Sequence, residues 1–145
     1  RRLSEQEFKD WLNINSNYLW TVRAKDKFGE YGIIGIFSIS IKEKEAHLVD
    51  FILSCRVVGR YIEDVMIKFL KEFCNENKIV KINGKYKKTE KNSLCYQFFN
   101  KLKIIDNKNY SFAFSSIQDK FNLPNITVIK PTNKGKFNVS KDTLA

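Results

Sequence analysis

The segment from residue 31 to residue 75 predicts two strands and a helix in immediate succession, which limits the folds open to the chain. YGIIGIFSISI, residues 31–41, is the strongest strand pattern, and AHLVDFILS, residues 46–54, follows it after a turn at KEKE. The helix covers about residues 60–75, where apolar residues recur at helical spacing: Ile62, Val65, Met66, Phe69, Leu70 and Phe73. The opposite side of this helix carries charges: Glu63, Asp64, Lys68, Lys71 and Glu72. A hairpin followed by such a helix predicts a sheet with the helix packed on it.

The remaining patterns extend this arrangement on both sides. SEQEFKDWL, residues 4–12, predicts a short helix with a capping box of Ser4 and Glu7. Strand patterns cover residues 18–24, 78–86, 109–116 and 125–130, and a second long helix covers roughly residues 90–102. Gly32 and Gly35 inside a strand indicate a bulge or a close approach of the backbone. We therefore predict one α+β domain over residues 1–145, with a mixed central sheet flanked by helices and a loose polar tail at 131–145.

The charge of the chain is strongly positive. Its 26 lysines and arginines against 16 aspartates and glutamates give a formal net charge of +10. Such a surface attracts anions, among them nucleic acid, acidic proteins and polyphosphate cofactors. Nucleic acid is the least favoured of these, because the sequence has no RNP-like aromatic pair, helix-turn-helix pattern or zinc ligand set. No apolar run approaches the roughly 20 residues that span a bilayer, so no membrane association is predicted.

The cysteines and the single histidine argue against a metal site. Cys55, Cys74 and Cys95 are widely spaced without a CxxC pair, and His47 is the only histidine. Reduced, buried thiols in a cytoplasmic protein are the expected state. Cys55 alone suggests a second reading, because a thiol beside a helix start and two arginines favours the nucleophilic thiolate.

The link between the second strand and the helix, LSCRVVGRYIED, residues 53–64, has the composition of a phosphate site. A helix N-terminus presents unpaired N–H groups and a partial positive charge, and glycine lets a phosphate approach the backbone closely. Arg56 and Arg60 would add charge-assisted hydrogen bonds beside Gly59. The alternative is structural: the glycine only makes a turn, and the arginines cap carbonyls or pair with Glu63 and Asp64.

RVVGRY resembles the [RQ]xxGx[GA] loop of the GNAT acyltransferases, which binds the pyrophosphate of coenzyme A. KNSLCYQFFNKLKI, residues 91–104, resembles the second GNAT signature, with Asn92, Cys95 and Phe99 at its key places. Four stretches, RRLSEQEF, DKFGEYGIIGI, DFILSCRVVGRYIED and YKKTEKN, also resemble the GNAT-like C-terminal region of FkbH-like proteins. In those proteins an N-terminal HAD-type domain loads a glyceryl group onto an acyl carrier protein. The resemblance covers residues 1–104 and implies that the chain is the back part of a longer protein.

The resemblance implies that acetyl-CoA or another acyl-CoA is bound and that its acyl group passes to an amine. The implied cofactor-binding residues are Leu53, Cys55, Arg56, Val57, Val58, Gly59, Arg60, Tyr61, Asn92 and Phe99. Two positions depart from the family pattern. Tyr61 stands where the loop prefers Gly or Ala, and Phe99 stands where many members have a tyrosine that protonates the departing thiolate.

Because Phe99 cannot donate a proton, the catalytic residues cannot be carried over from the family pattern alone. Tyr96, one turn before Phe99, is the predicted substitute for the proton donor. Asp50 is the predicted general base, ahead of Glu30 and Glu45. No metal is predicted. The alternative function is a non-catalytic GNAT-like domain whose basic face docks an acidic acyl carrier protein for a HAD-type neighbour.

Overall fold

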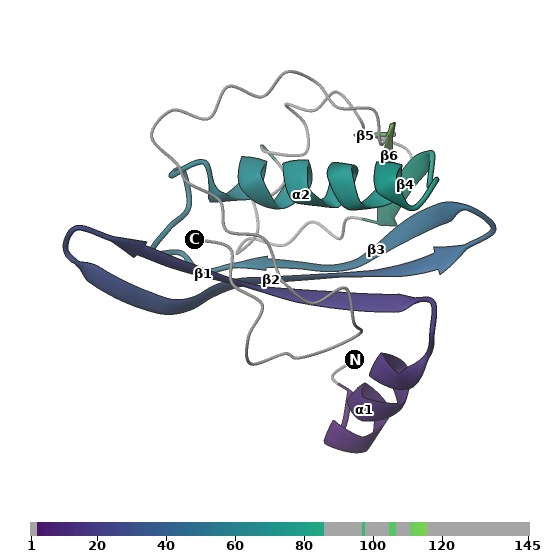
Figure 1. Cartoon of the computed structure of the whole chain (residues 1–145), viewed down its shortest axis with the longest axis horizontal. Coiled ribbons are helices and arrows are strands. Elements are labelled where there is room, and N and C mark those ends of the chain that lie inside the picture. The colour runs from purple at the N-terminus through teal and green to yellow at the C-terminus, as the bar shows by residue number, and fades with distance from the viewer. Residues whose placement is uncertain (1–2, 86–96, 98–104, 107–110, 116–145) are drawn as a thin grey trace.

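The computed structural model describes residues 3–85, 97, 105–106 and 111–115, which form one mixed sheet with helices on it (Figure 1). The helices are α1 (Glu5–Asn13) and α2 (Ile62–Glu76). The strands are β1 (Asn17–Asp26), β2 (Gly29–Lys42), β3 (Glu45–Leu53), β4 (Lys81–Lys85), β5 (Ile105–Asp106) and β6 (Ser111–Ser115). They lie in the order β1-β2-β3-β4-β6-β5. β3 and β4 are parallel, and every other neighbouring pair is antiparallel. This confirms the predicted α+β class with a mixed sheet.

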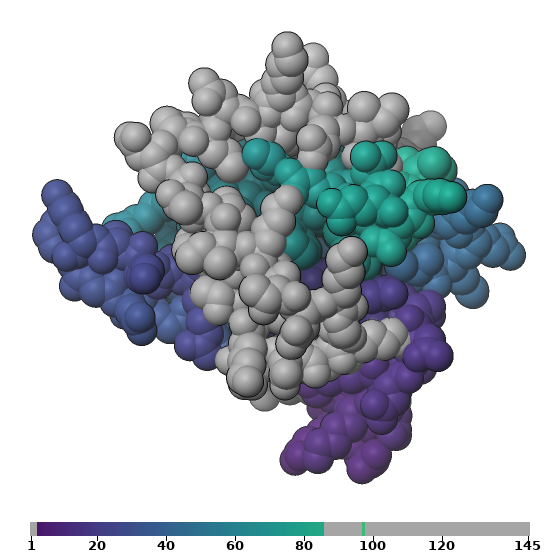
Figure 2. Space-filling model, in the orientation of Figure 1, coloured from purple at the N-terminus to yellow at the C-terminus, as the bar shows by residue number. Residues whose placement is uncertain are grey.

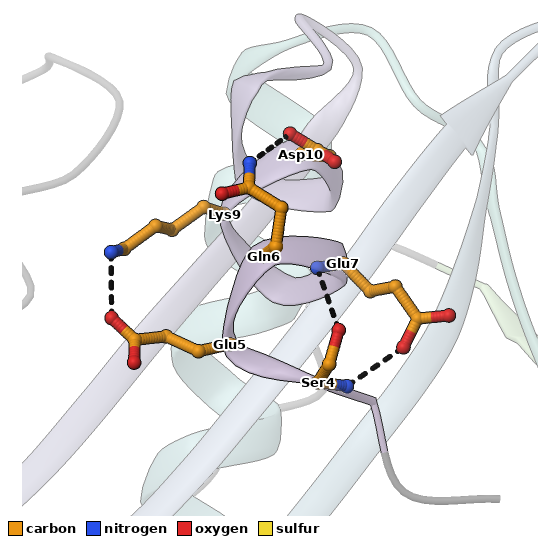
Figure 3. Close-up of polar contacts among 6 residues, drawn as sticks. All are labelled: Ser4, Glu5, Gln6, Glu7, Lys9 and Asp10. Carbon is orange, nitrogen blue, oxygen red and sulfur yellow. Dashed lines mark hydrogen bonds and ion pairs between the residues drawn. The ribbon is translucent and has the colours of Figure 1, made fainter.

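Helix α1 is fixed locally by its first turn (Figure 3). The Ser4 hydroxyl accepts from the Glu7 amide at 3.2 Å, and the Glu7 carboxylate accepts from the Ser4 amide at 2.7 Å. These two bonds form the predicted capping box and satisfy two amides that the helix cannot pair. The end of the helix is joined to β1 because the Asn17 side-chain amide donates to the Trp11 carbonyl at 2.8 Å. α1 lies on the side of the sheet away from α2 (Figure 1).

The core lies between the sheet and α2. Trp20 on β1 is its centre: its ring centroid lies 5.1 Å from that of Phe37, 5.4 Å from Phe69 and 4.8 Å from Phe73. Tyr18 stacks on Trp20 at 5.8 Å. Offset and edge-to-face contacts of this kind stabilise beyond the area that they bury. Trp20 therefore belongs to the core, and Tyr18 packs against it.

The glycines of β2 act in two different ways. A Cβ on Gly35 would lie 3.2 Å from the Ile52 carbonyl oxygen and 3.4 Å from the Met66 sulfur, so β3 and α2 approach the backbone closely there. Gly32 has φ +69°, a left-handed conformation, with nothing within 4 Å of a Cβ. Around these residues the β1–β2 register shifts between Val22 and Lys25. Both a bulge and a close approach are present, as the sequence predicts.

Helix α2 confirms the predicted periodicity, although it begins at Ile62 rather than at about residue 60. The placement of Lys71 on the exposed face is wrong, because this residue is 4% exposed. The buried arc of α2 is wider than the apolar stripe, since Ile67 and Cys74 on the same flank are also fully buried. A lysine tolerates such a position because its four-carbon stem packs like an aliphatic side chain.

The elements predicted after residue 78 are confirmed only in part, because some of them lie outside the described residues. The strand expected at 78–86 is β4, shortened at its start, and the strand expected at 109–116 is β6. β5 was not predicted. The second helix at 90–102 (apart from Gln97), the strand at 125–130 and the tail at 131–145 lie outside the described residues. In the part of the chain that the structure describes, no helix is long and apolar enough to cross a membrane.

Candidate functional site

The turn of residues 54–61 leads from the end of β3 into α2 and is built mainly from backbone hydrogen bonds. The Val57 amide donates to the Ser54 carbonyl at 3.1 Å, and the Arg60 amide donates to the Val57 carbonyl at 3.2 Å. Val57 anchors the turn because its side chain is 2% exposed and belongs to the core. Gly59, at φ +81°, lets the chain reverse between these bonds.

The outer side of this turn offers amides to an anion. Among residues 3–85, the amides of Val58, Tyr61 and Ile62 have no hydrogen-bond partner. A Cβ built on Gly59 would meet no atom within 4 Å, so the backbone is open there. Unpaired amides at a helix start beside a glycine fit a phosphate group.

Tyr61 is the N-cap of α2, with φ +64° and no side-chain capping bond. Its side chain is 52% exposed. The backbone at this position is therefore in the left-handed region that favours glycine and is unusual for a tyrosine.

Both arginines of the turn contact the β1–β2 hairpin instead of the acids of α2. The Arg56 guanidinium donates to the Tyr31 carbonyl at 3.4 Å and to the Ser54 hydroxyl at 3.2 Å. The Arg60 guanidinium donates to the Tyr31 hydroxyl at 3.5 Å and lies 3.9 Å from Asp26. Hairpin and turn are at the same end of the sheet (Figure 1), where the hairpin projects from the body of the molecule (Figure 2).

Tyr31 and Asp26 link this hairpin electrostatically to the turn. The Tyr31 hydroxyl donates to the Asp26 carboxylate at 2.7 Å. This bond, followed by the Phe28 amide, lowers the pKa of Asp26 below its ordinary value. The same hydroxyl raises the pKa of Arg60, whose guanidinium also lies over the Tyr31 ring at 5.7 Å. The structural alternative allowed the arginines to cap carbonyls or to pair with Glu63 and Asp64. Arg56 does cap a carbonyl, and the described partners of Arg60 are Tyr31 and Asp26.

Glu63, in the first turn of α2, bends back onto the candidate phosphate turn. Its Oε1 accepts from the Gly59 amide at 3.0 Å. Its Oε2 is buried and has no hydrogen-bond partner among the described residues. One amide of the turn is thus already held by an anion that belongs to the chain.

Asp50 lies on β3 just past the last β3–β4 pair among the described residues. That pairing runs from Glu45 opposite Lys81 to Leu48 opposite Gly84, while β3 itself continues to Leu53. The β2–β3 register shifts next to Asp50, because Ser38 pairs with it and Ile39 pairs with Leu48. Val49 is the extra residue in β3. Asp50 follows it and lies beyond the last described pair between β3 and β4.

The carboxylate of Asp50 is positioned by one buried hydroxyl. Ser38 on β2, itself 0% exposed, donates to Asp50 Oδ2 at 2.6 Å. The two other candidate bases are less well placed. Glu45 binds the Asn83 side chain at the far end of β3, and Glu30 is exposed on the hairpin.

The cysteines differ from the expectation at one position. Cys55 is exposed, so the buried strand-end thiol predicted there is wrong. The reason is that the chain turns out of the sheet after Leu53, which leaves Cys55 in the outer part of the turn. Cys74 is buried as expected, and burial raises its pKa to about 12. No group of three metal-ligating side chains occurs among the described residues.

The structure brings together most of the predicted site. Leu53, Cys55, Arg56 and the five residues that follow form the end of β3 and the turn, and Asp50 lies on β3. Asn92, Tyr96 and Phe99 lie outside the described residues, so their roles stay predictions. Sequence reasoning missed Tyr31, Asp26 and Ser38. Only Ser38 carried a signal, as a polar residue within the apolar run GIFSIS.

Comparison with known proteins gives a fold but not a family. No family model matches the chain, and no curated protein matches it. Among solved structures, a GNAT-family acetyltransferase from Staphylococcus aureus Mu50 is similar, with TM-score 0.55 and 15% identity over 80% of this chain and 82% of that one. The ribosomal-protein-S18-alanine N-acetyltransferase from Escherichia coli is similar with TM-score 0.57 and 8% identity, over 85% and 83%.

A third similar structure is the PaiA N-acetyltransferase from Thermoplasma acidophilum, solved in complex with coenzyme A. Its TM-score is 0.50 and its identity 16%, over 58% of this chain, which spans only 54% of the PaiA chain. The chain therefore has a GNAT-like α+β fold. The finer resemblance to FkbH-like proteins, with their HAD-type domain and carrier protein, stays a prediction.

Proposed function

We propose that this chain is an N-acyltransferase domain that takes an acyl group, such as acetyl, from an acyl-CoA and transfers it to an amine. The observation that carries the proposal is the turn of residues 54–61, which joins β3 to α2 and presents unpaired amides beside Gly59. The GNAT-like fold and the RVVGRY sequence support coenzyme A as the anion. The unpaired amides of Val58, Tyr61 and Ile62 would hold its pyrophosphate.

The reacting end of the ligand would lie where β3 continues beyond its described pairing with β4. A bound acyl-CoA supplies a thioester that an amine attacks directly. Asp50 would accept the proton that the amine loses, and Ser38 would keep the Asp50 carboxylate in place. Tyr96 is the proposed donor of a proton to the leaving thiolate, because Phe99 has none to give.

The test is a calorimetric titration of the chain with coenzyme A and acetyl-CoA, alongside Gly59→Glu. We expect a micromolar Kd, roughly −8 kcal/mol, and loss of binding in the variant because it adds a carboxylate to the turn. Gly32→Glu is the matched control: Gly32 also has a left-handed φ, +69°, and open space around it, but it lies on β2. Absence of binding to the unmodified chain at millimolar ligand would refute the proposal.

Catalysis is tested separately with an amine acceptor and Asp50→Asn. The amide can still accept from Ser38, so the local structure is kept while the proton acceptor is lost. We expect kcat/KM to fall by about 10²–10⁴, the usual contribution of a general base, with coenzyme A affinity unchanged. An unchanged kcat/KM would exclude Asp50 as the base.

One observation favours the second candidate, a non-catalytic domain that docks an acyl carrier protein. The Glu63 carboxylate already binds the Gly59 amide, as in a turn that no longer needs a ligand. The exposed basic side chains of Arg56 and Arg60 would then face an acidic partner. This function predicts carrier-protein binding that weakens with salt and no turnover of acetyl-CoA.

A further inference from the structure

We propose that Glu63 is a built-in competitor for the anion of the 54–61 turn and sets how tightly this chain binds its ligand. The inference rests on the proposed coenzyme A site and adds a determinant of its affinity. It starts from the 3.0 Å hydrogen bond in which the Gly59 amide donates to Glu63 Oε1. A carboxylate and a phosphate oxygen are both anionic acceptors, so both cannot hold the same amide.

The other carboxylate oxygen of Glu63 is left unsatisfied by this contact. Oε2 is buried and has no hydrogen-bond partner within the described part of the chain. An ionised oxygen without a partner carries a desolvation penalty, which an ordinary capping interaction avoids. The Glu63 side chain is therefore held at the turn by one bond and loses little when a stronger anion takes its place.

Charge adds to the competition. Glu63 lies in the first turn of α2, where the helix dipole stabilises one negative charge. A pyrophosphate bound to the neighbouring amides would bring further negative charge within a few ångströms of this carboxylate. The ligand must then either displace the side chain or bind against its repulsion. Removing the charge should strengthen anion binding by about tenfold, which corresponds to about 1.4 kcal/mol.

The chain offers a matched control in Asp64, the other acid of the first turn. Asp64→Asn changes the net charge and the interaction with the helix dipole as Glu63→Gln does, while the bond to Gly59 is made by Glu63. A difference between the two variants therefore reports on the contact rather than on the overall charge.

The test compares the unmodified chain, Glu63→Gln, Glu63→Ala and Asp64→Asn. Titrations use coenzyme A and, separately, inorganic pyrophosphate, which has neither adenine nor pantetheine. Hydrogen exchange of the Gly59 amide gives a readout without ligand: Glu63→Ala should exchange faster there, and Asp64→Asn should not. We expect both Glu63 variants to bind each ligand about tenfold tighter than the unmodified chain, and Asp64→Asn to differ from it by less than about twofold.

The outcomes separate this inference from the proposed function. Equal affinity in all four proteins, with coenzyme A bound, overturns the role of Glu63 and leaves the coenzyme A site standing. Tighter pyrophosphate binding in the Glu63 variants without coenzyme A binding in any protein supports the competitor and overturns the proposed function. Absence of binding to either ligand in all four overturns both. Circular dichroism confirms that each variant is folded.

Discussion

Gly35 is the position where the packing beneath the site makes its sharpest prediction. A Cβ there would lie 3.2 Å from the Ile52 carbonyl oxygen, 3.3 Å from Leu53 Cδ1 and 3.4 Å from Met66 Sδ. All three distances are shorter than, or at the limit of, an ordinary contact of about 3.5–4.0 Å. Gly35→Val adds two methyl groups beyond this Cβ, in a place where one neighbour is backbone and cannot rotate away.

Two effects oppose each other in this substitution. Valine in place of glycine raises the strand propensity by up to about 1 kcal/mol. Overpacking of a close contact costs about 1–3 kcal/mol. Because Gly35 is buried, packing should win, and we expect Gly35→Val to lower the free energy of unfolding by about 1–2 kcal/mol.

The assay is urea unfolding followed by far-UV circular dichroism. The midpoint should fall without a change in slope, since the surface exposed on unfolding stays the same. Gly35→Ala should give a smaller loss, because only the Cβ is added. Gly32→Ala should cost about 1 kcal/mol for another reason, its φ of +69°. A midpoint for Gly35→Val at or above that of the unmodified chain would show that β2, β3 and α2 are not packed as described.

Three smaller predictions concern single contacts. Tyr31→Phe removes the strongest cause of the low pKa of Asp26, so NMR titration should show that pKa rising toward its ordinary value of about 3.9. A carboxylate whose pKa is lower in the folded state stabilises the fold at pH values above its unfolded pKa, and this stabilisation is lost as the pH falls. Tyr31→Phe removes most of that contribution, so acid should destabilise this variant less than the unmodified chain. Iodoacetamide should label the exposed Cys55 and spare Cys74, whose pKa is raised to about 12, until the protein unfolds; mass spectrometry locates the label. Ser4→Ala breaks the capping box and should destabilise α1 by about 1 kcal/mol, seen as faster hydrogen exchange in that helix (Figure 3).

The sequence predicted the elements whose causes are local. The helical spacing of α2, the apolar run of β2 and the capping box at Ser4 each depend on residues within a few positions of one another. The prediction from periodicity was wrong at Lys71, which is buried. Apolar periodicity identifies the helix face that meets the sheet, but it does not show how wide the buried arc of the helix is. β5 was missed because a two-residue strand carries no pattern.

The partners of the arginines could not be predicted in the same way. Arg60 contacts Asp26 and Tyr31, which are far from it in sequence. Only the β1–β2 and β2–β3 registers bring these residues close together. The nearer acids Glu63 and Asp64 were the reasonable expectation for a helix start. The arginines bind the hairpin instead, because the turn directs both guanidinium groups toward it. There the Tyr31 carbonyl and hydroxyl and the Asp26 carboxylate are available as acceptors.

Tyr61 adopts a backbone conformation that is unusual for a tyrosine. Tyr61 has φ +64°, in the left-handed region that favours glycine, and Gly59 two residues earlier has φ +81°. A tyrosine in this conformation costs about 1–2 kcal/mol relative to glycine, so the surrounding turn must hold it there. That turn is held by the buried Val57, by the arginine contacts to Tyr31 and by the Glu63 carboxylate on Gly59. The same carboxylate that steadies the backbone of the turn therefore also occupies one of the amides beside the proposed phosphate site.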